Sequence, residues 1–179
     1  MAWLWVVLAA LLVIGPVAYL MPSKRDRRLA ALRTRARLEG GVVSIEHLPK
    51  LDAEAHERVS AGGEVRSPTV MLARYALAGG RVLKDVPEVQ IMRHPDGRWR
   101  QDERQVRADS AWVDLLAQTA AALPEDTLAV SVSPQDVGMS WLESSPADEA
   151  VVTAVYATLK GLKTAAAKMA EPSGDDGMP

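Results

Sequence analysis

Few side chains in this 179-residue chain have the type and spacing that chemistry requires. The three histidines are His47, His56 and His94, and none has a second histidine at the spacing used by zinc sites on helices. The chain has no cysteine, so disulfides, thiolate metal sites and a cysteine nucleophile are excluded. The histidines therefore predict neither a metal centre nor a nucleophilic site.

One acidic cluster deserves comparison with a cation site. The stretch LDAEAHE brings Asp52, Glu54, His56 and Glu57 together, and such oxygen ligands could bind a hard cation weakly. The alternative is an ordinary solvated loop face. The chain has no glycine-rich dinucleotide loop, no phosphate-binding P-loop and no Gly-x-Ser-x-Gly elbow, because Ser140 in VGMSW has a glycine on one side only. We expect a protein that is not an enzyme and that needs no cofactor or metal.

A second group of polar side chains surrounds the sequence HPDG at residues 94–97, which is typical of a tight turn between two strands. The candidate partner-binding residues here are Arg93, Arg98, Trp99 and Arg100. Arginine and tryptophan are common in protein-binding hot spots, and arginines could also contact phospholipid headgroups. The alternative is a solvated hairpin with Trp99 turned into the core.

A run of seven basic residues occupies positions 24–37: Lys24, Arg25, Arg27, Arg28, Arg33, Arg35 and Arg37. Of the 21 basic and 23 acidic residues, seven basic and two acidic ones lie in residues 21–40, leaving 14 and 21 elsewhere. The rest of the chain is therefore acidic, whereas nucleic-acid binders usually present a basic face. We expect no nucleic-acid partner.

The basic run follows 19 uncharged residues, from Trp3 to Met21, which would span roughly 28 Å as a helix. This length predicts a transmembrane helix. A cleaved signal peptide is the alternative, but its basic residues would precede the apolar segment. Because basic flanks stay on the cytoplasmic side, the N-terminus is expected outside and the remainder inside a bacterial inner membrane, with the basic run at the lipid surface.

The remaining sequence predicts helices and strands in alternation. A basic helix should cover 23–40 and end at Gly40 and Gly41. Strands are expected over 42–48, 69–78, 82–92 and from Trp99 onward, and a second hairpin over 128–143. Asp109 should cap one amphipathic helix and Ser145 another that extends to about Ala170.

Together these elements predict an α+β fold: an N-terminal transmembrane helix and a basic juxtamembrane helix, then a small, mainly antiparallel sheet packed with two helices. The expected organisation is a transmembrane anchor (1–22), a juxtamembrane helix (23–40), a cytoplasmic α+β domain (41–170) and a disordered tail (171–179).

The order of a single span, the sequence MPSKRDRR and a small β-containing domain resembles the YajC family, the single-span accessory subunits of the bacterial preprotein translocase. The resemblance covers about the first forty residues and rests on Pro22 and the basic residues Lys24, Arg25, Arg27 and Arg28. It implies a single-pass inner-membrane protein associated with the translocase.

The sequence thus predicts a membrane-anchored, non-enzymatic accessory or assembly protein. Its expected partners are the lipid bilayer and an unidentified membrane-protein complex. The alternative function is a membrane-bound small-ligand sensor or enzyme with an anion site on the 93–100 hairpin.

Overall fold

The computed structural model describes residues 3, 23–60, 62–101, 106–144 and 146–171. It contains three long helices, one short 3-10 helix and six strands in the described ranges. In chain order these are α2 (Lys24–Leu38), β1 (Val42–Pro49), β2 (Thr69–Ala78), η1 (Gly80–Leu83), β3 (Val89–Arg93), β4 (Trp99–Gln101), α3 (Ser110–Ala120), β5 (Thr127–Val132), β6 (Asp136–Trp141) and α4 (Glu149–Ala170).

All six strands form one sheet in the order β1-β2-β6-β5-β3-β4, and every neighbouring pair is antiparallel. The strand β1 pairs along its whole length with β2, with Ile45 opposite Ala73. Pairing of β2 with β6 places Tyr75 opposite Met139, which joins the first and second halves of the chain. The sheet therefore ends in two edge strands, β1 and β4.

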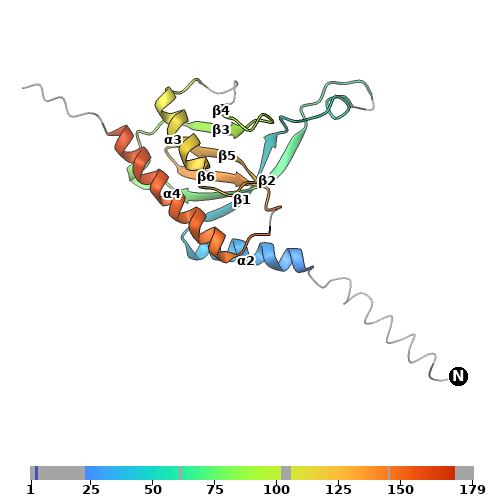
Figure 1. Cartoon of the computed structure of the whole chain (residues 1–179), viewed down its shortest axis with the longest axis horizontal. Helices are drawn as coiled ribbons and strands as arrows, with labels where there is room; N and C mark the ends of the chain where they lie inside the picture. The colour runs from blue at the N-terminus through green and yellow to red at the C-terminus, as the bar shows by residue number, and fades with distance from the viewer. Residues whose placement is uncertain (1–2, 4–22, 61, 102–105, 145, 172–179) are drawn as a thin grey trace, which may run out of the picture.

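The main core lies between one face of the sheet and the helices. Alternate residues along β2, β5 and β6 point to this face, including Tyr75, Val130 and Trp141, all of which are fully buried. Figure 1 shows α3 and α4 crossing the sheet, with α2 alongside α4. Leu159 of α4 and Leu116 of α3 are also fully buried. Apolar residues recur at every second position in the strands and at every third or fourth position in the helices. Each element therefore has one apolar side, which explains this two-layer arrangement.

The predicted fold class is wrong in its transmembrane helix. Of the helices that the structure describes, none is both long enough and apolar enough to cross a membrane. The prediction rested on the segment from Trp3 to Met21, and all of that segment except Trp3 lies outside the described residues. The membrane, transmembrane and single-pass assignments therefore have no support in the structure, and the inner-membrane location stays a prediction.

Two local expectations also differ from the structure. The segment expected as a strand over 82–92 begins with the last two residues of η1, and its extended part starts only at Val89 in β3. The backbone turns at Gly80, whose φ of 64° is one that residues with a side chain rarely adopt. The second amphipathic helix is capped by Asp148, whose carboxylate accepts hydrogen bonds from the backbone N–H groups of Ala150 and Val151. The expected cap, Ser145, lies outside the described residues.

Candidate functional site

The face of the sheet opposite the main core, here called the open face, carries polar and apolar groups in separate regions. The strand register places Ser44 and Glu46 of β1, Arg74 of β2 and Ser140 of β6 on it, because opposing residues of an antiparallel pair point to the same side. A small apolar cluster of Leu48, Leu72, Met92 and Ala129 belongs to this face, and none of the described helices contributes to it.

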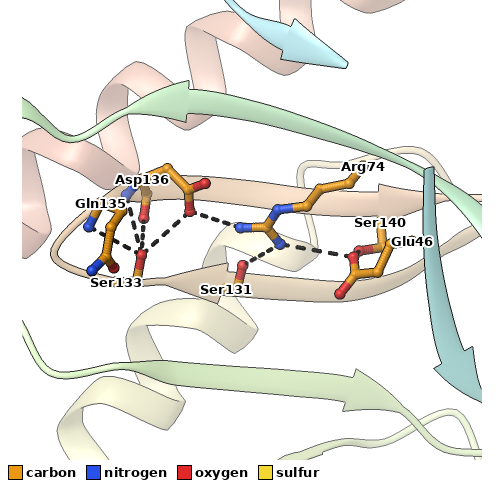
Figure 2. Close-up of polar contacts among 7 residues, drawn as sticks. All are labelled: Glu46, Arg74, Ser131, Ser133, Gln135, Asp136 and Ser140. Carbon is orange, nitrogen blue, oxygen red and sulfur yellow. Dashed lines mark hydrogen bonds and ion pairs between the residues drawn. The ribbon is translucent and has the colours of Figure 1, made fainter. Parts of the chain in front are cut away.

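Arg74 is the centre of the polar region (Figure 2). Its guanidinium donates to Asp136 Oδ1 at 2.7 Å and to Ser131 Oγ at 2.9 Å, and its Nη1 lies 3.8 Å from Glu46 Oε2. Ser140 Oγ donates to the same Glu46 oxygen at 2.6 Å. The Arg74 guanidinium is therefore held between the carboxylates of Asp136 and Glu46. Each carboxylate also contacts a serine: Ser140 contacts Glu46, and Ser133 Oγ lies 3.4 Å from Asp136 Oδ1. We call these residues the Arg74 cluster.

Gly138 lets the Arg74 side chain lie flat on the sheet. A Cβ at this position would be 3.0 Å from Arg74 Nη2, 3.1 Å from Arg74 Cζ and 3.1 Å from the Tyr75 carbonyl oxygen. These separations are tighter than ordinary van der Waals contacts. The missing side chain of this glycine therefore leaves the space in which the guanidinium lies across β6, between Ser131 and Glu46.

The apolar region of the open face is hollowed at the end where β1, β3 and β6 finish. The hollow has a volume of about 580 Å³. Its apolar wall consists of Leu48, Leu51, Val70, Met92, Leu128 and Leu142, and its rim includes Lys50, Asp52, His94 and Pro95. Small-molecule sites typically have volumes of about 300–1,000 Å³ and the same combination of apolar walls with a few polar groups.

The charged residues at the rim of the hollow are mostly paired within the chain. Lys50 Nζ contacts Glu57 at 2.6 and 2.8 Å, and this pairing raises the pKa of Lys50 and lowers the pKa of Glu57. Arg93 donates to the backbone carbonyl of Glu125. The hollow therefore offers an apolar surface whose neighbouring cations already have partners.

The structure places the residues predicted as one partner-binding group in different surroundings along the 93–100 hairpin. Arg93 contacts the carbonyl of Glu125, whereas Arg100 forms an ion pair with Asp96. Trp99 is partly buried against the main core, and Arg98 is exposed. The hairpin turn itself is present, with Arg98 N–H donating to Asp96 Oδ1 at 3.0 Å. Arg93 lies directly opposite Trp99 on one side of the sheet, whereas Arg100 lies opposite Met92 and therefore on the other side.

The basic residues of α2 are divided between intramolecular contacts and solvent. Ser23 and Asp26 form a capping box at the start of this helix. Lys24, Arg25, Arg27 and Arg37 are exposed, while the other three contact the rest of the chain, and these are Arg28, Arg33 and Arg35. The predicted contact of the seven residues with lipid headgroups stays a prediction.

Glu143 fastens α2 to the end of the sheet. Arg33 Nη2 donates to its Oε2 at 2.8 Å, Tyr75 Oη donates to its Oε1 at 2.7 Å, and Arg28 donates to its carbonyl at 3.2 Å. Burial and the adjacent Glu143 carboxylate raise the pKa of Tyr75. The backbone φ of Glu143 is 53°, which is uncommon for a residue with a side chain and is maintained here by three contacts.

The acidic stretch near His56 does not form a cation site in the structure. Glu57 pairs with Lys50, and Glu54 Oε2 lies 3.2 Å from His56 Nδ1 at an exposed position. Within the described ranges, no group of three histidine, aspartate or glutamate side chains is arranged to hold a metal ion. The contacts favour the alternative of a solvated loop face.

Sequence reasoning missed the Arg74 cluster and the hollow. One signal for the cluster is present, because Arg74 is the only charged residue in the apolar strand TVMLARYALA. Its partners Glu46 and Asp136 are 28 residues before it and 62 residues after it, so only the pairing of β1 and β6 with β2 brings them together.

Comparison of the chain with known protein families, with curated proteins and with solved structures found no match. The resemblance to the translocase accessory subunits therefore stays a prediction.

Proposed function

We propose that this chain is a non-enzymatic protein-binding domain that holds an apolar segment of a partner protein in the hollow of the open face. The observation that carries the proposal is the hollow itself: about 580 Å³ of space against Leu48, Val70, Met92, Leu128 and Leu142, on a face that the described helices leave uncovered. Burying one large apolar side chain of a partner there contributes roughly 1.5–3 kcal/mol.

The alternative anion site on the 93–100 hairpin has less support. Arg93 and Arg100 each have an intramolecular acceptor, so an anion would have to displace the Glu125 carbonyl or the Asp96 carboxylate. The rim cation Lys50 is likewise paired with Glu57. An apolar ligand needs none of these exchanges. Membership of the partner in a translocase complex stays a prediction.

A displayed library of random twelve-residue peptides tests the proposal. Selection is done on the wild-type chain, with counter-selection on Leu128→Glu, which places a carboxylate on the wall of the hollow. Val82→Glu is the matched control, because Val82 is an exposed apolar residue in η1, outside the hollow. We expect enriched peptides to share a large apolar residue and to bind the wild type and Val82→Glu equally well.

The measured quantity is the peptide Kd from fluorescence anisotropy. Loss of about 1.5–3 kcal/mol corresponds to a Kd raised by roughly 10- to 100-fold in Leu128→Glu. Leu142→Glu, on another part of the wall, should give a loss in the same range. Circular dichroism of each variant verifies that it is folded. Enriched peptides that bind both hollow variants as tightly as the wild type would contradict the proposal, as would a selection that enriches nothing.

A further inference from the structure

The two edges of the sheet differ in how well they are protected against pairing with another strand. In the residues that the structure describes, β4 comprises only Trp99–Gln101, and Arg100 forms an ion pair with Asp96. β1 has eight residues and a single charged side chain, Glu46, which is engaged with Ser140 on the open face. Proteins commonly protect edges by short strands and charged side chains, and β1 has little of either.

The outer edge of β1 also has apolar side chains in contact with solvent. Val42 is 62% exposed and Ile45 is 51% exposed, although both lie within a strand. In the part of the chain that the structure describes, the backbone of β1 forms its strand hydrogen bonds with β2 only, because β1 is the last strand of the sheet. The edge therefore presents outward-pointing backbone groups flanked by apolar surface.

We propose that β1 pairs with β1 of a second copy of the chain, antiparallel and centred on Ile45, so that the two sheets continue into one. This inference does not rest on the proposed function, because it uses the backbone edge of β1, and Leu48 is the one paired residue that also lines the hollow. A twofold interface requires the same patch on both copies, and an antiparallel pair of identical strands meets this requirement.

The register follows from the side chains. Opposing residues of an antiparallel pair point to the same side of a sheet. A twofold axis perpendicular to the sheet leaves each residue on the same face in both copies. One residue near the middle of β1 must therefore lie opposite its own copy. The two central candidates are Ile45 and Glu46. Centring on Glu46 would place two carboxylates directly opposite each other, which is unfavourable.

Centring on Ile45 gives compatible pairs throughout the strand. Ile45 then lies opposite its own copy, Ser44 opposite Glu46, Val43 opposite His47, and Val42 opposite Leu48. No like charges meet, and the exposed apolar surface of Ile45 is covered by an identical side chain. This complementarity is the argument for a second copy of the chain as the occupant of the edge.

The absence of cysteine from the chain allows a direct test by disulfide formation. Opposing Cα atoms in an antiparallel pair are about 4.5–5.5 Å apart, within the range a disulfide accepts. Ile45→Cys in the full chain should thus form a covalent dimer on mild oxidation at least ten times faster than Val82→Cys, a control at another exposed apolar position. His47→Cys should resemble the control, since its two copies would be about 13 Å apart.

Mixing Val43→Cys chains with His47→Cys chains should produce a disulfide dimer that neither forms alone. Without oxidation, Ile45→Lys places two charges opposite each other and should lower the average mass in sedimentation equilibrium, whereas Val82→Lys and Leu128→Glu should not. Ile45→Cys that links no faster than Val82→Cys would overturn the proposal and leave another protein as the occupant of the edge. Equal rates for His47→Cys and Ile45→Cys, or an Ile45→Lys chain of unchanged mass, would overturn it too.

Discussion

Gly41, which joins α2 to β1, has no space for a side chain. A Cβ at this position would lie 1.9 Å from Tyr156 Oη, 2.1 Å from Cζ and 2.2 Å from Cε1. Tyr156 is fully buried on α4, so its ring has little room to move. Excess atoms in a packed core usually cost about 1–3 kcal/mol, and contacts this short belong at the upper end. We expect Gly41→Ala to lower the free energy of unfolding by about 3 kcal/mol.

The assay is urea unfolding of the full chain followed by tryptophan fluorescence, in a double-mutant cycle with Tyr156→Leu. Leucine lacks the three ring atoms concerned, so Gly41→Ala should cost less than about 1 kcal/mol in that background. Gly161→Ala is the control, because a Cβ there meets no heavy atom within 4 Å outside its own helix. It should stabilise α4 by roughly 0.8–1 kcal/mol. An equal cost of Gly41→Ala in both backgrounds would refute the steric reasoning.

Three further predictions concern the attachment of the helices and the buried tyrosines. Glu143→Gln should lower the free energy of unfolding by about 1.5–2 kcal/mol, since it weakens the charge-assisted bond from the partly exposed Arg33, whereas the exposed Glu125→Gln should change it little. Asp148→Ala should cost about 1 kcal/mol by removing the cap of α4, and an unchanged urea midpoint would contradict the capping geometry. Burial raises the pKa of Tyr156 to about 12, above its ordinary value near 10. Between these values the unfolded chain loses the proton and the folded chain keeps it, so stability should be complete below pH 10 and fall above it by about 1.4 kcal/mol per pH unit per buried tyrosine. Tyr156→Phe should reduce that slope in unfolding experiments from pH 9 to 12, and an unaltered slope would refute the assignment.

Local patterns in the sequence predicted those elements whose signals lie within a few residues. The strand expected over 69–78 matches β2, because alternation places Ala73 and Tyr75 in the core and Arg74 on the other face. The HPDG turn and the cap of α3 at Asp109 were also predicted correctly. Each of these features depends on neighbouring residues in the chain, so one sequence contains enough information.

Features that depend on distant pairing could not be predicted in the same way. The order β1-β2-β6-β5-β3-β4 places the sixth strand between the second and the fifth, and no short-range pattern specifies that neighbour. Within the predicted group, the pairing of β3 with β4 places Arg93 opposite Trp99 and puts Arg100 on the other side of the sheet, where it forms an ion pair with Asp96. The arginine content of the hairpin does not specify this division, and the partner-binding role of these residues stays a prediction.

The Arg74 cluster restricts where a partner can pack on the open face. An apolar segment lying over Arg74 would remove water from Asp136 and Glu46, and partly exposed ion pairs lose more from desolvation than they gain unless every polar atom keeps a partner. The hollow imposes no such cost, because its wall is apolar and its rim cation Lys50 is already paired. A partner that buries its apolar side chains in the hollow can leave the cluster hydrated at the border of the interface, or satisfy it with polar groups. The contrast between these two regions of one face is the physical reason for placing the binding site at the end of the sheet rather than at its centre.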